Sequence, residues 1–72
     1  MTKSILKKDY EKLLQKIKKA REEAGLTQKE AAKKLRAHQS FMSKVETGER
    51  RIDVIELKKL AEIYKKKISY FL

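Results

Sequence analysis

The chain has no proline and only two glycines in its 72 residues, so few of its residues would force a helix to end. Its apolar residues recur at steps of three and four, which is the spacing that gathers side chains on one face of an α-helix. The sequence lacks the alternating pattern of a half-buried strand. We therefore expect an all-α fold, and a chain of this length allows one domain, residues 1–72.

Two helices are predicted for the first half of the chain. The first runs from about Asp9 to Ala24, and the residues before Asp9 either extend it or fray. Its apolar stripe consists of Tyr10, Leu13, Leu14, Ile17, Ala20 and Ala24. Thr27 and Glu30 then form a capping box, so the second helix begins at Gln28. The buried stripe of the second helix consists of Ala31, Ala32 and Leu35.

Two helices are also predicted near the C-terminus. Asp53 and Glu56 form a second capping box, which opens the first of them. The apolar stripe of this helix consists of Ile55, Leu57, Leu60, Ala61, Ile63 and Tyr64. Lysines 65–67 fall in its last turn, where cations suit the helix dipole. Ser69 then caps a last short helix over residues 70–72.

The middle of the chain has the spacing of a helix-turn-helix. A helical pattern spans Gln39 to about Thr47, and its apolar residues are Phe41, Met42 and Val45. Three residues separate this helix from the second one, Gln28–Leu35. Two short helices joined by so short a turn are typical of a helix-turn-helix. The expected architecture is a compact bundle of about five short helices that contains this motif.

The composition argues against several classes of protein. There is no cysteine for a disulfide or a thiolate metal site, and His38 is the one histidine, so we expect no metal. No segment approaches the roughly 18 apolar residues of a membrane span, and residues 1–8 lack the apolar run of a signal peptide, which favours a cytoplasmic protein. A nucleophile–base pair and a glycine-rich phosphate loop are both missing, so we expect neither an enzyme nor a cofactor.

The net charge of +10 is the first indication of function. A strongly basic domain is attracted to polyanions, chiefly nucleic acid or an anionic membrane. The stripe of the first helix has the width of a core-facing helix, which argues against binding to a membrane surface. Most of the basic residues are lysines, which on exposed helix faces often serve only solubility. Charge alone therefore leaves nucleic-acid binding and a merely solvated surface as equal alternatives.

The stretch from Ile17 to Leu60 resembles the lambda-repressor/Cro-type (XRE-like) helix-turn-helix family. The resemblance is carried by residues 25–28 (GLTQ), 31–32 (AA), 39–46 (QSFMSKVE) and 47–51 (TGERR), which occur in the order and spacing of that family. It implies binding to double-stranded DNA, with the helix over residues 39–47 in the major groove.

The resemblance assigns base contacts to four residues of that recognition helix: Gln39, Ser40, Ser43 and Lys44. The chemistry of these side chains agrees, because Gln39 can pair bidentately with adenine and Lys44 can reach guanine O6 and N7. The alternative is an ordinary solvated helix face. The resemblance also implies a partly buried salt bridge between Arg21 and Glu46 that locks the first helix to the recognition helix. An exposed ion pair of little energetic weight is the alternative there.

Five residues are candidates for contacts with DNA phosphates: Gln28, Arg36, His38, Arg50 and Arg51. The family implies that Gln28 also braces the recognition helix. Guanidinium groups match phosphate oxygens, and we expect one of Arg50 and Arg51 to bind phosphate rather than both. Relatives often carry glycine in place of Arg36, because the turn needs a positive φ. Either this turn is built differently, or the strain is tolerated because Arg36 meets a phosphate. His38 stands where Ser or Thr commonly caps the recognition helix, and it is a weaker cap.

A homodimer is expected, because one small domain makes few contacts with DNA. The family places the interface on the C-terminal helices, where the candidates are Ile63, Tyr64, Ile68, Tyr70, Phe71 and Leu72. The alternative is that this tail folds back onto the first helix. The expected function is sequence-specific DNA binding in transcriptional regulation, as a repressor or a restriction–modification controller on a palindromic operator. The alternative is an antitoxin or adaptor whose main partner is a toxin or another protein.

Overall fold

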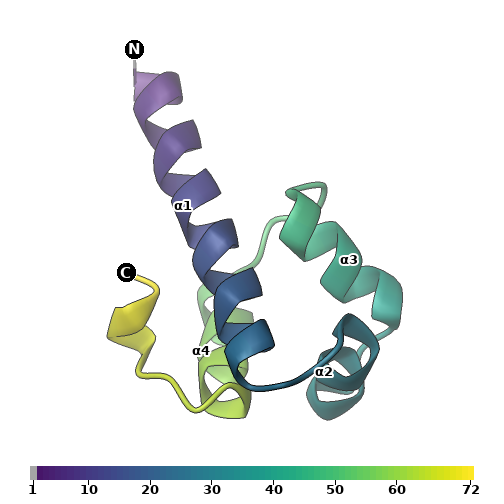
Figure 1. Cartoon of the computed structure of the whole chain (residues 1–72). Helices are drawn as coiled ribbons and strands as arrows, with labels where there is room; N and C mark the ends of the chain where they lie inside the picture. Colours follow the sequence, from purple (N-terminus) through teal and green to yellow (C-terminus); the bar gives the residue numbers. More distant parts are fainter. Residues whose placement is uncertain (1) are drawn as a thin grey trace.

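The computed structural model describes the backbone of residues 2–72 and the side chains from residue 7 onward (Figure 1). Its four α-helices are α1 (Thr2–Glu23), α2 (Gln28–Leu35), α3 (Gln39–Thr47) and α4 (Val54–Ile63). A 3-10 turn, η1 (Ile68–Tyr70), follows α4. Figure 1 shows α2 and α3 joined by a short turn to the right of α1, with η1 to its left. The predicted all-α fold is confirmed.

Helix α1 is longer than the apolar stripe alone indicates. It begins at Thr2 rather than Asp9, so the residues before Asp9 extend the helix. Its 22 residues make a rod about 33 Å long, and its N-terminal half runs beyond the other helices (Figure 1). The helix continues this far because the segment contains no glycine or proline and is rich in lysine and leucine, which favour helices.

Both predicted capping boxes are present, and they determine where α2 and α4 begin. Thr27 Oγ1 accepts from the Glu30 N–H at 3.1 Å, and Glu30 Oε1 accepts from the Thr27 N–H at 2.9 Å. Asp53 Oδ1 accepts from the Glu56 N–H at 2.7 Å, and Glu56 Oε1 accepts from the Asp53 N–H at 3.0 Å. Each box satisfies backbone donors that the first turn of a helix leaves without partners.

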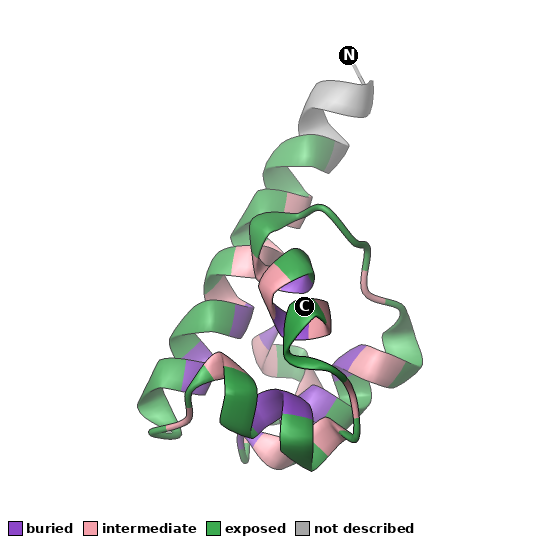
Figure 2. Cartoon of the chain, turned by 90° about the vertical axis from the view of Figure 1, so that its right-hand side faces the viewer, coloured by how far each residue is buried: buried purple, intermediate pink, exposed green. Residues whose placement is uncertain are grey.

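The four helices and the C-terminal turn share one apolar core (Figure 2). Its buried members are Ile17, Ala20, Ala31, Ala32, Met42, Val45, Leu57, Leu60, Ala61, Tyr64 and Phe71. Ala31 and Ala32 give α2 a flat inner face, which lets the neighbouring helices approach closely. The core-facing roles predicted for Met42 and Val45 are confirmed.

Three predictions for the C-terminal third are wrong. Ile55 is 60% exposed, because the cap at Asp53 sets a register in which Leu57 and Leu60 face the core. The last helix expected over residues 70–72 is instead the 3-10 turn η1, which follows Lys67 rather than Ser69. Lysines 65–67 lie beyond the end of α4, so they do not occupy its last turn.

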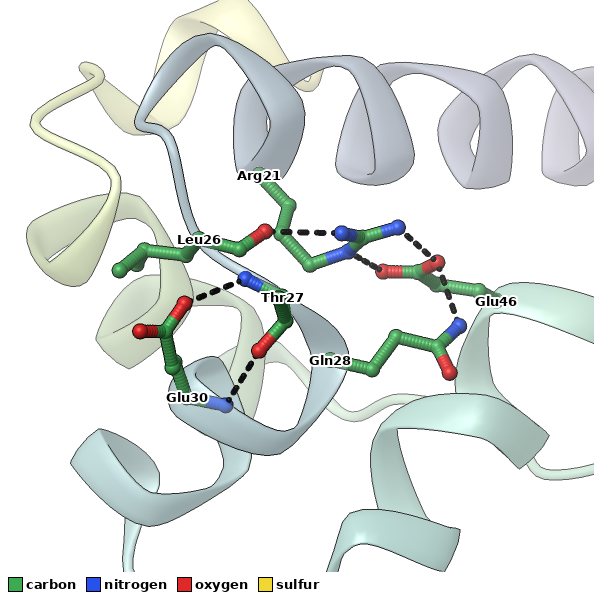
Figure 3. Close-up of polar contacts among 6 residues, drawn as sticks. All are labelled: Arg21, Leu26, Thr27, Gln28, Glu30 and Glu46. Atoms are coloured by element: carbon green, nitrogen blue, oxygen red, sulfur yellow. Dashed lines mark hydrogen bonds and ion pairs between the residues drawn. The ribbon is translucent and has the colours of Figure 1, made fainter.

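The predicted Arg21–Glu46 pair is a buried bridge between α1 and α3 (Figure 3). Arg21 Nε donates to Glu46 Oε2 at 2.6 Å, and a second guanidinium nitrogen donates to Glu46 Oε1 at 3.1 Å. The side chains are only 11% and 4% exposed. The third guanidinium nitrogen donates to the Leu26 carbonyl at 2.8 Å, and Gln28 Nε2 donates to Glu46 Oε1 at 2.9 Å. The bridge therefore fixes α3 against α1, the α1–α2 loop and the start of α2.

The turn between α2 and α3 contains Arg36 in the left-handed conformation, at φ +61°. Its N–H donates to the Lys33 carbonyl at 3.1 Å and so closes the C-terminus of α2. The turn thus has the positive φ that the resemblance implies, with arginine in place of glycine. Arginine is strained in this conformation by about 1–2 kcal/mol, because its Cβ crowds the following carbonyl.

Loss of one partner of the buried bridge should strongly destabilise the protein. We expect Arg21→Met to lower the free energy of unfolding by about 3–5 kcal/mol, because the Glu46 carboxylate stays buried without its cation. Adding Glu46→Leu should recover a large part of that loss, since no uncompensated charge then remains. Urea unfolding followed by circular dichroism measures both effects. Glu23→Gln, which breaks the exposed Lys66–Glu23 pair, is the control and should leave the midpoint unchanged. Wild-type stability in Arg21→Met would show that the bridge does not hold the fold together.

Relief of the strained turn should stabilise the protein. We expect Arg36→Gly to raise the free energy of unfolding by about 0.5–1 kcal/mol. The substitution removes the backbone strain, and this gain exceeds the cost of the greater conformational entropy that glycine gives the unfolded chain. Thermal unfolding measures the change. Arg36→Ala keeps the Cβ and should give no such gain, so equal stabilisation by both variants would mean that backbone strain is not the cause.

Candidate nucleic-acid interface

Helix α3 presents one polar face to solvent and one apolar face to the core. Gln39, Ser40 and Lys44 are exposed, whereas Ser43 is half-buried. Met42 and Val45 are fully buried on the opposite face. Three of the four predicted base-contacting residues are therefore open to solvent, and Ser43 is less accessible than they are. The buried Glu46 in the last turn holds the helix in this orientation.

The N-terminus of α3 is open. His38 occupies the N-cap position, but its side chain accepts no capping hydrogen bond, in agreement with its prediction as a weak cap. His38 itself is exposed. The first backbone N–H groups of α3 therefore carry no side-chain cap, and they add partial positive charge beside the polar face.

Gln28 opens α2 and is tied to the recognition helix. It is half-buried, and its amide donates to Glu46 in the network of Figure 3. The predicted bracing role of Gln28 is confirmed by this bond. Arg36 lies at the opposite end of α2 from Gln28. There it lines a groove between α2 and α4 together with Lys59 and Glu62. The structure thus does not bring Arg36 together with Gln28.

Arg50 and Arg51 follow α3 directly, but their surroundings differ. The Arg50 guanidinium pairs with both carboxylate oxygens of Glu56, each at 3.0 Å, and lies 4.5 Å from the centre of the Phe41 ring. Hydrogen bonding from Arg50 lowers the pKa of Glu56. Arg50 is therefore engaged in holding the start of α4 against α3.

Arg51 is exposed and has no ion pair among the described residues. Its guanidinium lies 4.5 Å from the centre of the Tyr10 ring. The Tyr10 hydroxyl accepts from the Ile52 N–H at 3.1 Å. Sequence reasoning placed Tyr10 only in the apolar stripe of the first helix, because nothing in the local pattern relates it to a loop 40 residues later.

The residues predicted to form the dimer interface differ in how far they are buried in the single chain. Tyr64 and Phe71 are buried in the core of the single chain, so their side chains are not on its surface. Burial raises the pKa of the Tyr64 hydroxyl, which has no hydrogen-bond partner among the described residues. Ile63, Ile68 and Tyr70 are half-buried, and Leu72 is 82% exposed. The tail therefore folds back in part, since Phe71 and Leu72 line a groove with residues of α1.

Other kinds of site find no support in the described part of the chain. No group of three histidine, aspartate or glutamate side chains there could hold a metal ion. None of the described helices combines the length and the apolar character needed to cross a membrane.

Comparison with known proteins agrees with this geometry. Residues 17–71 match the helix-turn-helix family HTH_3. The structure is also similar to that of an XRE-family like protein from Pseudomonas syringae pv. tomato str. DC3000, with a TM-score of 0.92 and 41% sequence identity over 97% of this chain and 85% of that chain. No curated protein matches the chain. These matches confirm the family resemblance seen in the sequence, and they indicate DNA binding rather than catalysis. The chain therefore belongs to the XRE (lambda-repressor/Cro-type) family of helix-turn-helix DNA-binding domains.

Proposed function

We propose that this protein binds double-stranded DNA sequence-specifically and regulates transcription in the cytoplasm as a homodimer on a palindromic operator. The observation that carries the proposal is the polar, exposed face of α3, which a buried salt bridge holds rigidly in a chain of net charge +10. A rigid helix with such a face can enter the major groove, where base pairs present distinguishable donors and acceptors.

Base recognition is assigned to the open face of α3. Gln39 can pair with adenine through its amide, and Lys44 can donate to guanine O6 and N7. Ser40 accompanies them with a less selective hydroxyl. Ser43 is half-buried, so its side chain is less accessible to a base than those of the other three.

Phosphate contacts are assigned to the residues around α3. Gln28 lies at the start of α2, and Arg51 is the arginine of the adjacent pair whose guanidinium has no carboxylate partner among the described residues. The ion pair with Glu56 makes Arg50 the less available of the two. His38 and Arg36 are both exposed in the turn before α3 and stay in the proposal as weaker phosphate contacts.

The dimer interface is assigned to the part of the C-terminal segment that remains on the surface: Ile63, Ile68, Tyr70 and Leu72. Leu72 is 82% exposed and Ile63, Ile68 and Tyr70 are half-buried, and apolar side chains left at the surface favour a partner surface of the same kind. Two copies related by a twofold axis would read two half-sites about one helical turn apart.

Selection from a random duplex library at roughly 0.15 M salt tests the function directly, because screening at this ionic strength weakens non-specific phosphate binding. Enrichment of a palindrome would support a dimeric regulator and would identify its operator. Binding that vanishes as salt rises, with no enriched sequence, would overturn the proposal in favour of a protein partner such as a toxin.

Substitutions on the open face of α3 should relax sequence preference. We expect Gln39→Ala and Lys44→Ala each to lose about 1–3 kcal/mol of discrimination at one base pair, while affinity for unrelated sequences changes less. Competition binding against operators with single base changes measures this. Lys59→Ala removes the same charge from α4 and should leave the preference unchanged. Intact specificity in both α3 variants would show that α3 does not read the bases.

The two adjacent arginines should respond differently to substitution. Arg51→Ala should weaken binding to all duplexes about equally and reduce the slope of log affinity against log salt by about 0.9, since one phosphate contact is lost. Arg50→Ala should mainly lower the unfolding midpoint, because its guanidinium already holds Glu56. Titrations across a salt series measure both slopes. Equal slope changes in the two variants would contradict the assignment to Arg51.

A further inference from the structure

Tyr10 connects the N-terminal half of α1 to the loop between α3 and α4. It precedes residues 17–71, which match the family, so this contact is made by a segment outside the matched unit. Its hydroxyl accepts from the Ile52 N–H at 3.1 Å, and its ring lies 4.5 Å from the Arg51 guanidinium carbon. One side chain therefore contacts both the backbone of the loop and its exposed arginine.

The backbone around Arg51 is held on both sides. The Arg50 N–H donates to the Lys44 carbonyl at 3.1 Å, and the Ile52 N–H donates to Tyr10. The Arg51 carbonyl itself accepts from the Arg50 guanidinium at 2.8 Å. These hydrogen bonds hold the backbone of the loop segment, but they do not determine the direction of the Arg51 side chain.

The cation–π contact with the Tyr10 ring fixes that direction without a carboxylate partner. An aromatic ring supplies no oxygen acceptor, so the N–H donors of the guanidinium remain available for a phosphate. An ion pair such as that of Arg50 occupies the same donors with a carboxylate. Arg51 is thus both ordered and able to donate to a phosphate.

We propose that Tyr10 is a positioning residue for DNA binding, which orders Arg51 for its phosphate contact before DNA arrives. The proposal rests on the phosphate-binding role of Arg51 given above. A long side chain that is ordered in advance loses less entropy on binding, and this gain corresponds to about three- to tenfold in affinity.

A double-mutant cycle tests the proposal. The proteins are wild type, Tyr10→Leu, Arg51→Ala and the double variant, titrated with a mixed-sequence duplex of about 25 base pairs at about 0.05 M salt, where phosphate contacts dominate affinity. Tyr10→Leu should weaken binding about three- to tenfold when Arg51 is present and have no effect when it is alanine.

Tyr10→Phe is the matched control. It keeps the ring beneath Arg51 but removes the acceptor for Ile52, so it should lower the unfolding midpoint and retain DNA affinity. A purely structural role for Tyr10 would instead give equal losses of affinity with and without Arg51, or a loss in Tyr10→Phe as large as in Tyr10→Leu. Either result would overturn the proposal. Failure of the wild-type protein to bind the duplex would overturn the DNA-binding function itself, and with it this role of Tyr10.

Discussion

The orientation of α3 depends on one buried ion pair. Arg21 and Glu46 are almost inaccessible to solvent, so each would be strongly destabilising without the other. Together with the Leu26 carbonyl and the amide of Gln28, they satisfy one another's hydrogen-bonding groups (Figure 3). A bidentate pair also has a preferred geometry, which apolar packing alone does not impose. The helix that carries the proposed base contacts is therefore held by a directional interaction at its C-terminal end.

The four arginines show how the same side chain takes different roles in different surroundings. Arg21 is buried against a carboxylate and is structural. Arg50 is at the surface but engaged by a carboxylate, and it holds a helix start. Arg51 makes a cation–π contact with Tyr10 and has no ion pair among the described residues, which suits it to the phosphate contact proposed above. Arg36 occupies a strained backbone position at the end of α2. In a chain of net charge +10, these environments separate the cations that support the fold from those available to a polyanion.

Local rules predicted most of the fold. The capping boxes at Thr27 and Asp53 and the bounds of α3 followed from residues within a few positions of one another, as helix starts generally do. The Arg21–Glu46 bridge came from family resemblance rather than from local pattern. The prediction failed in the C-terminal segment, where Phe71 turns inward to the core and the chain forms a 3-10 turn instead of a helix. A run of three apolar residues does not itself tell whether they pack on their own chain or on a partner.

The sequence by itself determined the all-α class and the helix-turn-helix spacing, because periodicity, caps and turn residues are properties of short segments. Its motifs also indicated the family, through their resemblance to known members. Only the tertiary structure decided which of two adjacent arginines has no ion pair among the described residues. That choice depends on Glu56 and Tyr10, which lie on different helices and meet the loop only after the chain has folded. The same holds for Tyr64 and Phe71, whose burial comes from packing between distant segments. Contacts of this kind depend on the geometry of the whole chain, which no local spacing of residues encodes.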